Sequence, residues 1–484
     1  MNARLISVLV TAAVLVACGD DSSAPDGSTD SSMTGDSSAV DSSSVDSSTP
    51  PDGGPPADGG SGTACAMPPA FDIGVTYDVT LHVATTGDDD SGDGSTGSPF
   101  ATIDRAARDA TPGTQILVGA GTYSGNIGLS DLNGSDGHPI AIVADGDVTL
   151  DAGGSGVGLA ISELAWVVVE GFTIRGAGVH GMNIDDGGSY DTPAHHLVLR
   201  DLTIPGAGSG GNNDCIKMSG VDDFWVLGSD VSGCDTGEII DMVGCHRGVI
   251  SGNYFHDTVG TGVQAKGGSA DTLIHGNRFE RIPGRGVNAG GSTGLEYFRP
   301  LDAPHEAARI RIVANTFDTV GEMGGAPVAY TGCDGCEFVN NTVVDPGTWV
   351  VRILQESTDA RFVPSRNGLF ANNIIVLRTG VIRTFFNVGG GTAPETFTFA
   401  NNLWQALDEG PGWTGPTYSD GIPPETGSLV QVDPQMVDRD GGNYRLMAGT
   451  PAEGAGSGPG FALPADFDGE CYANPPTLGA FEIP

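Results

Sequence analysis

The sequence predicts an all-β solenoid, a parallel β-helix, and three observations carry this prediction. A short β-rich phrase recurs at intervals of roughly 24 to 38 residues, which is the range of solenoid repeats. The 77 glycines, together with the asparagines inside many copies, supply tight bends between short strands. Helical periodicity of 3.6 residues is scarce. An antiparallel sandwich or a propeller is the alternative that the same short strands allow.

Each copy of the phrase joins two short strands through a bend. The copies begin at Val168, Val198, Val226, Val249, Leu273, Ile312, Phe338, Ala371 and Ala400. Asn suits the bend because it tolerates left-handed dihedral angles, and stacked Asn side chains can hydrogen-bond from coil to coil. We therefore expect a ladder of asparagines along the solenoid.

Both ends of a solenoid expose unpaired backbone and need caps. Residues 102–110 can form a short amphipathic helix with Ile103, Ala106 and Ala107 on its apolar face, and we expect this helix to lie over the first coil. We assign residues 65–484 to one parallel β-helix domain with an N-terminal and a C-terminal cap.

The N-terminus predicts export. Residues 1–17 carry one basic residue, Arg4, and an apolar run too short to span a bilayer, which needs about 20 residues, so they fit a signal peptide. The run ends in Leu15-Val16-Ala17-Cys18, which resembles a bacterial lipobox and implies lipidation of Cys18. Gly19 after the cysteine then favours the outer membrane or cell surface. An ordinary signal peptide with an incidental cysteine is the alternative.

The composition indicates the nature of residues 18–64 and the kinds of partner that the protein can bind. Residues 18–64 consist mainly of Ser, Asp, Gly, Pro and Thr, contain no Lys or Arg, and are expected to form a disordered tether. The formal net charge of −40 argues against nucleic acid as a partner, because phosphates would be repelled. An acidic glycan is still possible where a local basic groove exists. We expect a monomer.

Seven cysteines remain if Cys18 is lipidated, and disulfides are permitted outside the cytoplasm. Cys333 and Cys336 are close enough in sequence to form a small local loop. One cysteine is left over, and the other pairings cannot be deduced from sequence.

Candidate chemistry gathers around Lys217 and Lys266, the only two lysines of the chain. Gly228, Gly252 and Gly276 are spaced by 24 residues, so Lys217 and Asp241 are expected at equivalent outward positions on adjacent coils, about 4.8 Å apart. A strict 24-residue register would place Ala265 next in this column. A one-residue slip would instead align Lys266 with the other two residues on one outer face.

This cluster has the groups that β-elimination on a uronate requires: a cation for the carboxylate, a base for the C5 proton and a proton donor for the leaving oxygen. We predict Lys266 as the base, with Arg285 and Arg299 as catalytic partners. Substrate-binding and metal candidates complete the prediction. They are Lys217, Asn288, Tyr297 and His305 for the substrate, and Asp214, Glu238 and Asp241 for Ca²⁺, which takes oxygen ligands.

A longer interval between copies supports this placement. From Phe279 to Phe317 the interval is 38 residues instead of 24, and the extra segment contains Tyr297, Arg299 and His305. Aromatic faces stack on sugars, and Arg binds carboxylates in bidentate fashion. The alternatives are a surface ion pair for Lys217 and Asp241, a solvated Lys266, and loop-anchoring ion pairs for Arg285 and Arg299.

Two segments carry a resemblance to a known family. The stretch from Leu81 to Tyr123, with Ser98-Pro99-Phe100-Ala101-Thr102-Ile103, resembles the N-terminal cap of right-handed β-helix proteins of the pectate-lyase superfamily, especially polysaccharide lyase family nine. Asp433-Pro434, Tyr444-Arg445-Leu446 and Leu478-Gly479-Ala480-Phe481-Glu482 resemble the ending of secreted bacterial members. The resemblance implies a right-handed solenoid and a lysine base beside an acidic calcium cluster. Lys266 matches that base, whereas the calcium aspartates do not match cleanly.

The sequence thus predicts a surface carbohydrate-active protein, foremost a lyase on an acidic, uronate-containing polysaccharide. The rival from another class is a non-catalytic β-helix protein that binds glycan or partners along its flank. A third hypothesis is an inverting hydrolase, which would need two carboxylates about 6.5–9.5 Å apart, drawn from Asp214, Glu238 and Asp241.

Overall fold

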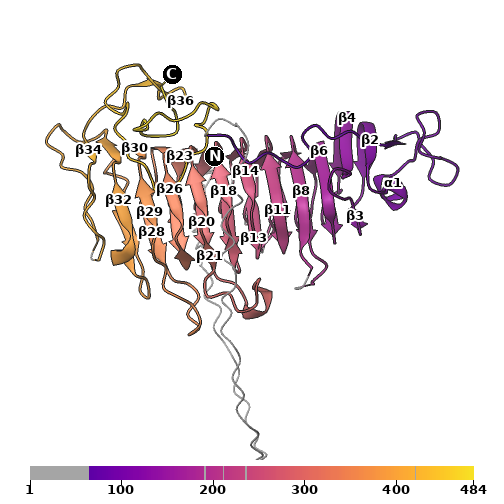
Figure 1. The fold of residues 1–484 in the computed structure, drawn as a ribbon, viewed down its shortest axis with the longest axis horizontal. Helices are drawn as coiled ribbons and strands as arrows, with labels where there is room; N and C mark the ends of the chain where they lie inside the picture. Colours follow the sequence, from indigo (N-terminus) through magenta and orange to yellow (C-terminus); the bar gives the residue numbers. More distant parts are fainter. Residues whose placement is uncertain (1–64, 190–191, 211, 235–236, 420, 484) are drawn as a thin grey trace, which may run out of the picture. The chain divides into compact units, whose positions relative to one another are not determined.

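The described residues stack as the coils of a parallel β-helix (Figure 1). The computed structural model describes residues 65–189, 192–210, 212–234, 237–419 and 421–483, all within the compact unit Ser61–Pro484. Every strand pair assigned in these residues is parallel except one pair near the C-terminus. The all-β solenoid predicted from the repeat is therefore confirmed.

One face of the solenoid is a ten-stranded sheet with one strand from each coil. Its strands are β3 (Ile127–Ser130), β5 (Leu159–Ser162), β7 (Met182–Asp185), β10 (Ile216–Ser219), β13 (Ile240–Val243), β16 (Val263–Lys266), β20 (Val287–Gly290), β24 (Val328–Thr331), β28 (Trp349–Leu354) and β31 (Thr384–Val388). Inward and outward side chains alternate, as strand geometry requires. In β10, for example, Ile216 and Met218 are fully buried while Lys217 points outward.

The rest of each coil belongs to a 21-stranded sheet. Long strands begin it: β1 (Val79–Val83), β2 (Thr114–Ser124), β4 (Ile140–Asp151) and β6 (Ala165–Arg175). The strands before the Asn bend are β8 (Ala194–Arg200), β11 (Val221–Leu227), β14 (Val249–Ser251), β18 (Leu273–His275), β22 (Arg311–Val313), β26 (Glu337–Val339), β29 (Leu369–Ala371) and β32 (Thr398–Ala400). Those after it are β9 (Thr203–Ile204), β12 (Asp230–Ser232), β15 (Tyr254–His256), β19 (Arg278–Ile282), β23 (Thr316–Val320), β27 (Thr342–Val344), β30 (Ile374–Leu377), β33 (Leu403–Ala406) and β34 (Leu429–Val430).

Small elements complete the assignment of the described residues. They are β17 (Ser269–Ala270), β21 (Ala307–Ala308) and β25 (Cys333–Asp334), the antiparallel pair β35 (Met436–Asp438) and β36 (Asn443–Leu446), and the 3₁₀ turns Leu295–Tyr297 and Pro394–Thr396.

The predicted asparagine ladder is present. Its side chains belong to Asn253, Asn277, Asn315, Asn341, Asn373 and Asn402. The Nδ2 of Asn253 donates to the Oδ1 of Asn277 at 2.9 Å, and Asn402 ends the series by donating to Glu425. The left-handed backbone lies one residue before each ladder asparagine, because the ladder side chain must point inward from the following position. Glycine takes this bend at Gly252 and Gly276, and asparagine takes it, as predicted, at Asn340, Asn372 and Asn401.

A stack of aromatic rings fills the interior beside this ladder. Phe255, Phe279, Phe317, Phe338 and Phe370 succeed one another from coil to coil, with ring centroids 4.6–5.3 Å apart. All five are fully buried. Such stacking adds a preferred ring geometry to the burial of apolar area. The interior is thus a continuous column, and the coils cannot shift past one another without breaking it.

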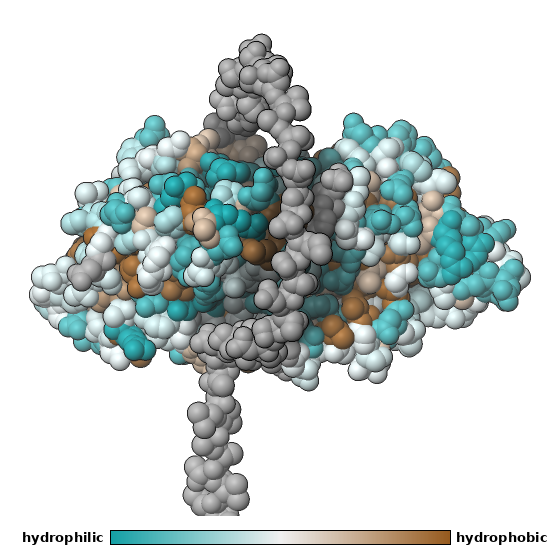
Figure 2. Space-filling view, turned by 90° about the horizontal axis from the view of Figure 1, so that it is seen from below, coloured by the Kyte–Doolittle hydropathy of each residue, from teal (hydrophilic) through white to brown (hydrophobic). Residues whose placement is uncertain are grey.

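The N-terminal cap lies over the first coils, and the C-terminal segment packs on the side of the solenoid. Helix α1 (Ile103–Asp109) begins after Thr102, whose Oγ1 accepts the Arg105 N–H, and it buries Ile103 and Ala106 against the first coils, as predicted. In the view of Figure 2, hydrophilic residues gather at this α1 end. The C-terminal segment packs on the outer side of β27, β30 and β33 instead.

Three disulfides are present among the described residues. Cys333 and Cys336 form the predicted local loop, Cys215 pairs with Cys234, and Cys65 pairs with Cys471. Cys245 is the leftover cysteine and is buried. Residues 1–64, with the predicted signal peptide, Cys18 and tether, lie outside the described residues. Within the described part, no helix is long and apolar enough to cross a membrane.

Candidate active site on the ten-stranded sheet

The predicted cluster lies on the outward face of β10, β13 and β16. Lys217 pairs with Asp241 across adjacent strands, as predicted. Asp241 then pairs with Gln264, and Lys266 pairs with Val243 in the next outward position. The prediction that all three charged residues share the outer face is confirmed, whereas the prediction that Lys266 falls in the same row as Asp241 is wrong.

The register error has a simple cause in the loop lengths. Ile240 pairs with Val263, 23 residues on, while Ile250 pairs with Ile274, 24 residues on. The loop that precedes β16 is one residue shorter than its counterpart before β13, and the turn after β16 is one residue longer. The slip therefore occurs in the opposite direction to the one expected, and it leaves the spacing of the glycines unchanged.

Long side chains compensate for the change of row. The Nζ of Lys266 lies 3.2 Å from Oδ1 of Asp241, and the Nζ of Lys217 contacts Oδ2 of the same carboxylate. Asp241 is completely buried beneath the two lysines, whose side chains are 15% and 12% exposed. Removal of a carboxylate from water is costly unless it is paired, so both ammonium groups stabilise Asp241 in this position.

Two further acids complete the cluster. Asp214 and Glu238 belong to the loops before β10 and β13, and one oxygen from each of Asp214, Glu238 and Asp241 lies within 4.8 Å of the others. The Oδ1 of Asp214 accepts the backbone N–H of Glu238 at 2.9 Å. Burial raises the pKa of Glu238 to about 8, helped by the negative charge of Asp241 and a hydrogen bond with Asp214.

The pKa of Lys217 responds to the same surroundings. Burial by itself would lower the pKa of this ammonium, but the charges of Asp241 and Asp214 outweigh burial and raise the pKa. Lys217 is therefore a cation that the cluster holds in place.

The three carboxylates are close enough together to hold one metal ion. However, two of these carboxylates already form ion pairs. Lys217 contacts Asp241 and lies 3.6 Å from Oδ2 of Asp214, and Lys266 lies near the other oxygen of Asp241. Ca²⁺ takes six to eight oxygen ligands and would have to lie against both cations. With Lys217 in this position, the donor set does not fit the calcium ion that the sequence resemblance implies.

A pocket of about 490 Å³ opens beside the lysines. Lys217, Lys266, Tyr297 and Arg299 line it, together with Asp185, Asp186 and Asn212. Three cations and two carboxylates thus face the pocket, although the whole chain carries a formal charge of −40. Lys217, Lys266, Tyr297 and Arg299 were all predicted as site residues, and the structure brings them together.

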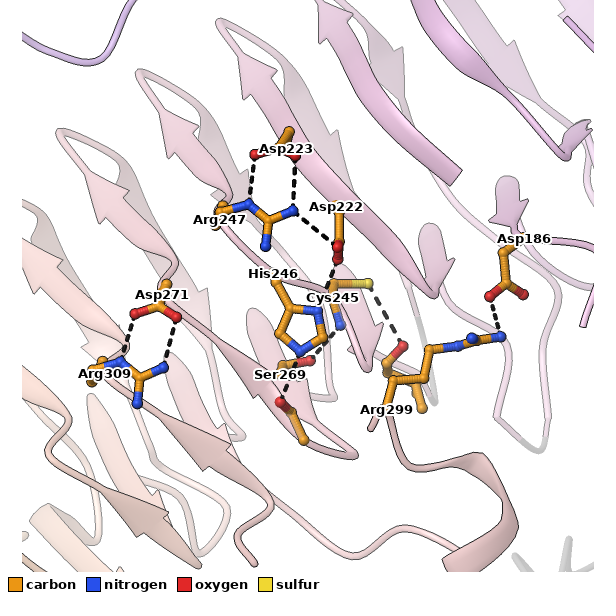
Figure 3. Close-up of polar contacts among 12 residues, drawn as sticks. Asp186, Asp222, Asp223, Cys245, His246, Arg247, Ser269, Asp271, Arg299 and Arg309 are labelled. Carbon is orange, nitrogen blue, oxygen red and sulfur yellow. Dashed lines mark hydrogen bonds and ion pairs between the residues drawn. The ribbon is translucent and has the colours of Figure 1, made fainter. Parts of the chain in front are cut away.

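Arg299 reaches the pocket because the loop after β20 lies directly on the turns of neighbouring coils. A Cβ atom at Gly244 would lie 2.6 Å from Cβ of Arg299, and one at Gly268 would lie 2.3 Å from its carbonyl oxygen, so only glycine permits this approach. The guanidinium forms an ion pair with Asp186 (Figure 3), whose side chain is 2% exposed. Its Nη1 donates to the Ser189 carbonyl at 2.6 Å.

Glu306 fixes the other end of this loop and was missed by sequence reasoning. It is fully buried, its Oε2 accepts the Gly267 N–H at 3.0 Å and the Thr293 hydroxyl at 2.7 Å, and its Oε1 accepts the Thr293 N–H. Asp186, the partner of Arg299, was missed as well. Neither acid carries a local motif, since each acts through residues distant in sequence.

His180 is a third neighbour that the sequence did not reveal. Its Nδ1 accepts the Asp214 N–H at 3.0 Å, which leaves the proton of the neutral ring on Nε2. Burial lowers the pKa of His180. The histidine thus supports the acidic cluster in its neutral form.

Three of the residues predicted for catalysis and substrate binding lie outside the pocket lining. Arg285 forms an ion pair with Glu356 at 2.9 Å, which anchors its loop. Asn288 follows Gln264 in the outward row, but it is 1% exposed and bonded to Gln264 and Thr331. His305 is partly buried, and burial lowers its pKa, with a smaller contribution from the positive charge of Arg309. Asn288 is bonded to side chains of the neighbouring strands, and Arg285 is held by a loop 71 residues further on, which a linear repeat cannot show.

Other arginines pair with acids along the neighbouring turns (Figure 3). Arg247 binds Asp223 through Nε at 2.7 Å and also contacts Asp222, and Arg309 binds Asp271 at 2.6 Å. These side chains lie on successive coils and hold adjacent turns together. Arg247 and Arg309 therefore join neighbouring turns and do not line the pocket, whereas Arg299 does.

Comparison with known proteins agrees with this architecture. Residues 155–351 match a family described as right handed beta helix region, and residues 85–178 match a protein of unknown function, DUF1565. No curated protein matches the chain. The crystal structure of pectate lyase Pel9A is similar with a TM-score of 0.55 and 15% identity, over 86% of this chain and 99% of that chain.

Two other solved structures are similar at lower scores. A GH136 lacto-N-biosidase from Eubacterium ramulus has a TM-score of 0.46 and 13% identity, over 72% of this chain and 67% of that chain. An alginate lyase from Paenibacillus sp. has a TM-score of 0.40 and 17% identity, over 68% of this chain and 98% of that chain. The family match and the likeness to Pel9A show a right-handed parallel β-helix of the pectate-lyase type, which confirms the fold that the sequence resemblance implied.

Proposed function

We propose that this protein is a polysaccharide lyase that cleaves an acidic, uronate-containing glycan by β-elimination, with Lys266 as the base. The observation that carries the proposal is the convergence of both lysines of the chain with Arg299 on one pocket. In a strongly acidic protein, such a pocket is a distinctive place for a carboxylate ligand. The similarity in fold to pectate lyase Pel9A makes the same class of reaction a candidate by analogy, and the residues of the pocket carry the assignment.

The reaction assigns one task to each group. Arg299 and Lys217 face the uronate carboxylate and reduce its charge, which makes the C5 proton more acidic. Lys266 first releases its ammonium proton to solvent, and its amine then takes the C5 proton. The C4–O bond breaks, and the electron pair of the former C–H bond forms the C4–C5 double bond. The departing oxygen takes a proton from water or from the Tyr297 hydroxyl at the pocket wall. No step is assigned to a metal ion.

The proposal includes a location. Lipidation of Cys18 would anchor the protein to the outer membrane or cell surface, and the Ser/Asp/Gly-rich segment up to residue 64 would hold the β-helix away from the lipid. An extracellular polysaccharide would then be accessible to the pocket, with the protein acting as a monomer.

The test is an ultraviolet absorbance assay for the unsaturated product. The purified protein is incubated with polygalacturonate, alginate and glycosaminoglycans, next to Lys266→Ala and the matched control Arg285→Ala, whose side chain lies outside the pocket. We expect product with at least one substrate, its loss in Lys266→Ala, and its retention in Arg285→Ala. Absence of product across the panel would remove the lyase assignment.

Two other outcomes would identify the competing functions. New reducing ends without ultraviolet absorbance would indicate a hydrolase. Binding of an acidic glycan that is lost in Lys266→Ala, without any product, would indicate a non-catalytic glycan-binding protein.

A further inference from the structure

We propose that Lys217 is a built-in cation that takes the place of a divalent metal ion in the acidic cluster of Asp214, Glu238 and Asp241. In this arrangement the native protein binds no Ca²⁺ at the cluster, and removal of Lys217 creates a metal site. The inference concerns the site of the proposed lyase but not its reaction, because its readout is metal binding.

The geometry around Lys217 carries the inference. The Nζ atom contacts Oδ2 of Asp241 and lies 3.6 Å from Oδ2 of Asp214, so one ammonium group faces two of the three acids. Asp214 and Asp241 are both completely buried, and Lys217 itself is only 15% exposed. The lysine thus occupies the position from which a bound cation would bridge the same oxygens.

Unbonded oxygens point to the same conclusion. Oδ2 of Asp214, Oε2 of Glu238 and Oδ1 of Asp241 are buried and make no hydrogen bond. Buried polar atoms without hydrogen bonds are rare, and here two of the three lie near ammonium groups, at 3.6 Å from Lys217 and 3.2 Å from Lys266. Ionic attraction to the two lysines therefore replaces the ligand bonds that these carboxylates would make to a metal.

The main chain sets this position. Lys217 is the second residue of β10 and pairs directly with Asp241 in β13, so their side chains leave the sheet side by side. Asp214 is three residues before Lys217, on the loop that leads into the same strand. An apolar residue at position 217 would leave three carboxylates within 4.8 Å of one another with Lys266 as their one neighbouring ammonium group among the described residues.

The test measures Ca²⁺ alone as the probe, by isothermal titration calorimetry and by the shift in thermal unfolding. Four proteins are compared: wild type, Glu238→Gln, Lys217→Met and the double variant Lys217→Met/Glu238→Gln. We expect wild type and Glu238→Gln to give the same weak, non-specific response. Lys217→Met is expected to gain one site with a dissociation constant of about 10⁻⁴–10⁻³ M, the range of extracellular calcium modules. The double variant should lose that site again.

Two results would overturn the inference. A specific Ca²⁺ site in wild type that disappears in Glu238→Gln would mean that the metal displaces the ammonium of Lys217. A folded Lys217→Met protein that gains no site would mean that the lysine does not stand in for a metal. The comparison of wild type with Glu238→Gln is decisive even if Lys217→Met fails to fold. Because none of these readings uses a glycan, they do not depend on lyase activity.

Discussion

Replacement of Lys266 by arginine separates a base from a simple binding charge. Arginine keeps a positive charge beside Asp241, where the Lys266 ammonium lies 3.2 Å from Oδ1, so the local charge balance is preserved. Its guanidinium does not lose a proton at working pH, however, and cannot take one from C5. Lys266→Arg should therefore bind substrate and fail to convert it.

The size of the effect follows from the role of the amine. Loss of a positioned general base costs about 10²- to 10⁴-fold in rate, or about 2.7–5.5 kcal/mol in the barrier. Ion pairing is retained in Lys266→Arg, so we expect kcat to fall by this factor while KM changes little. Lys266→Ala should lose the same factor in kcat, and its KM should also rise because one of the three pocket cations is gone.

The assay is the ultraviolet progress curve on the substrate found for wild type, recorded over a range of substrate concentrations. Arg285→Lys serves as the control, because Arg285 pairs with Glu356 outside the pocket and should keep wild-type kcat and KM. If Lys266→Arg retained more than about a tenth of the wild-type kcat, the amine would not be the base, since even the smallest effect expected of a general base is about 10²-fold.

Three further predictions concern binding, stability and pH. Arg299→Ala should raise KM by about 10-fold or more, because the pocket loses an arginine that can bind a carboxylate; steady-state kinetics measure this effect. The same change should destabilise the fold by about 3–5 kcal/mol, because buried Asp186 loses its partner; urea unfolding measures this effect. Asn315→Ala breaks the ladder in mid-stack and should lower the free energy of unfolding in urea by about 2–4 kcal/mol, because the buried Asn277 N–H and the Ile274 and Val313 carbonyls each lose a partner. His275 is buried, and its Nε2–H donates to the Ala465 carbonyl at 2.6 Å. Burial lowers its pKa below the unfolded value of about 6.5, so the unfolded chain takes up a proton more readily than the folded protein as the pH falls. The free energy of unfolding should therefore decrease below about pH 6.5, by up to about 1.4 kcal/mol per pH unit.

Each of these predictions has a control. The double variant Asp186→Asn/Arg299→Ala should be more stable than Arg299→Ala, but its KM should stay as high. If its KM also returned to the wild-type value, Arg299 would not bind the substrate. An exposed asparagine, Asn133, offers a comparison for the ladder, and equal costs at the two positions would contradict the role of stacking. His275→Gln should show a shallower loss of melting temperature between pH 8 and pH 5, which thermal unfolding checks, and an unchanged slope would exclude this histidine as the cause.

The repeat was sufficient to predict the architecture because a solenoid is local in sequence. Each coil packs on its neighbours, so a phrase that recurs about every 24 residues already contains the contacts that matter. The ladder of asparagines and the pairing of Lys217 with Asp241 both follow from this regularity. The capping helix after Thr102 follows instead from the apolar pattern of residues 102–110. Grouping of Asp214, Glu238 and Asp241 was predicted for the same reason.

The irregular parts required the tertiary structure. A loop one residue shorter before β16 moved Lys266 into the next row, and only the reach of its side chain returned the amine to Asp241. The long insertion brought Arg299 to Asp186, more than 100 residues away, and left His305 outside the pocket lining. Sequence alone thus determined the stack and its charged face, because their interactions join equivalent positions of neighbouring coils. The pocket depended on where the insertion folds, because the insertion's anchors, such as the buried Glu306, bind residues that no repeat relates to them.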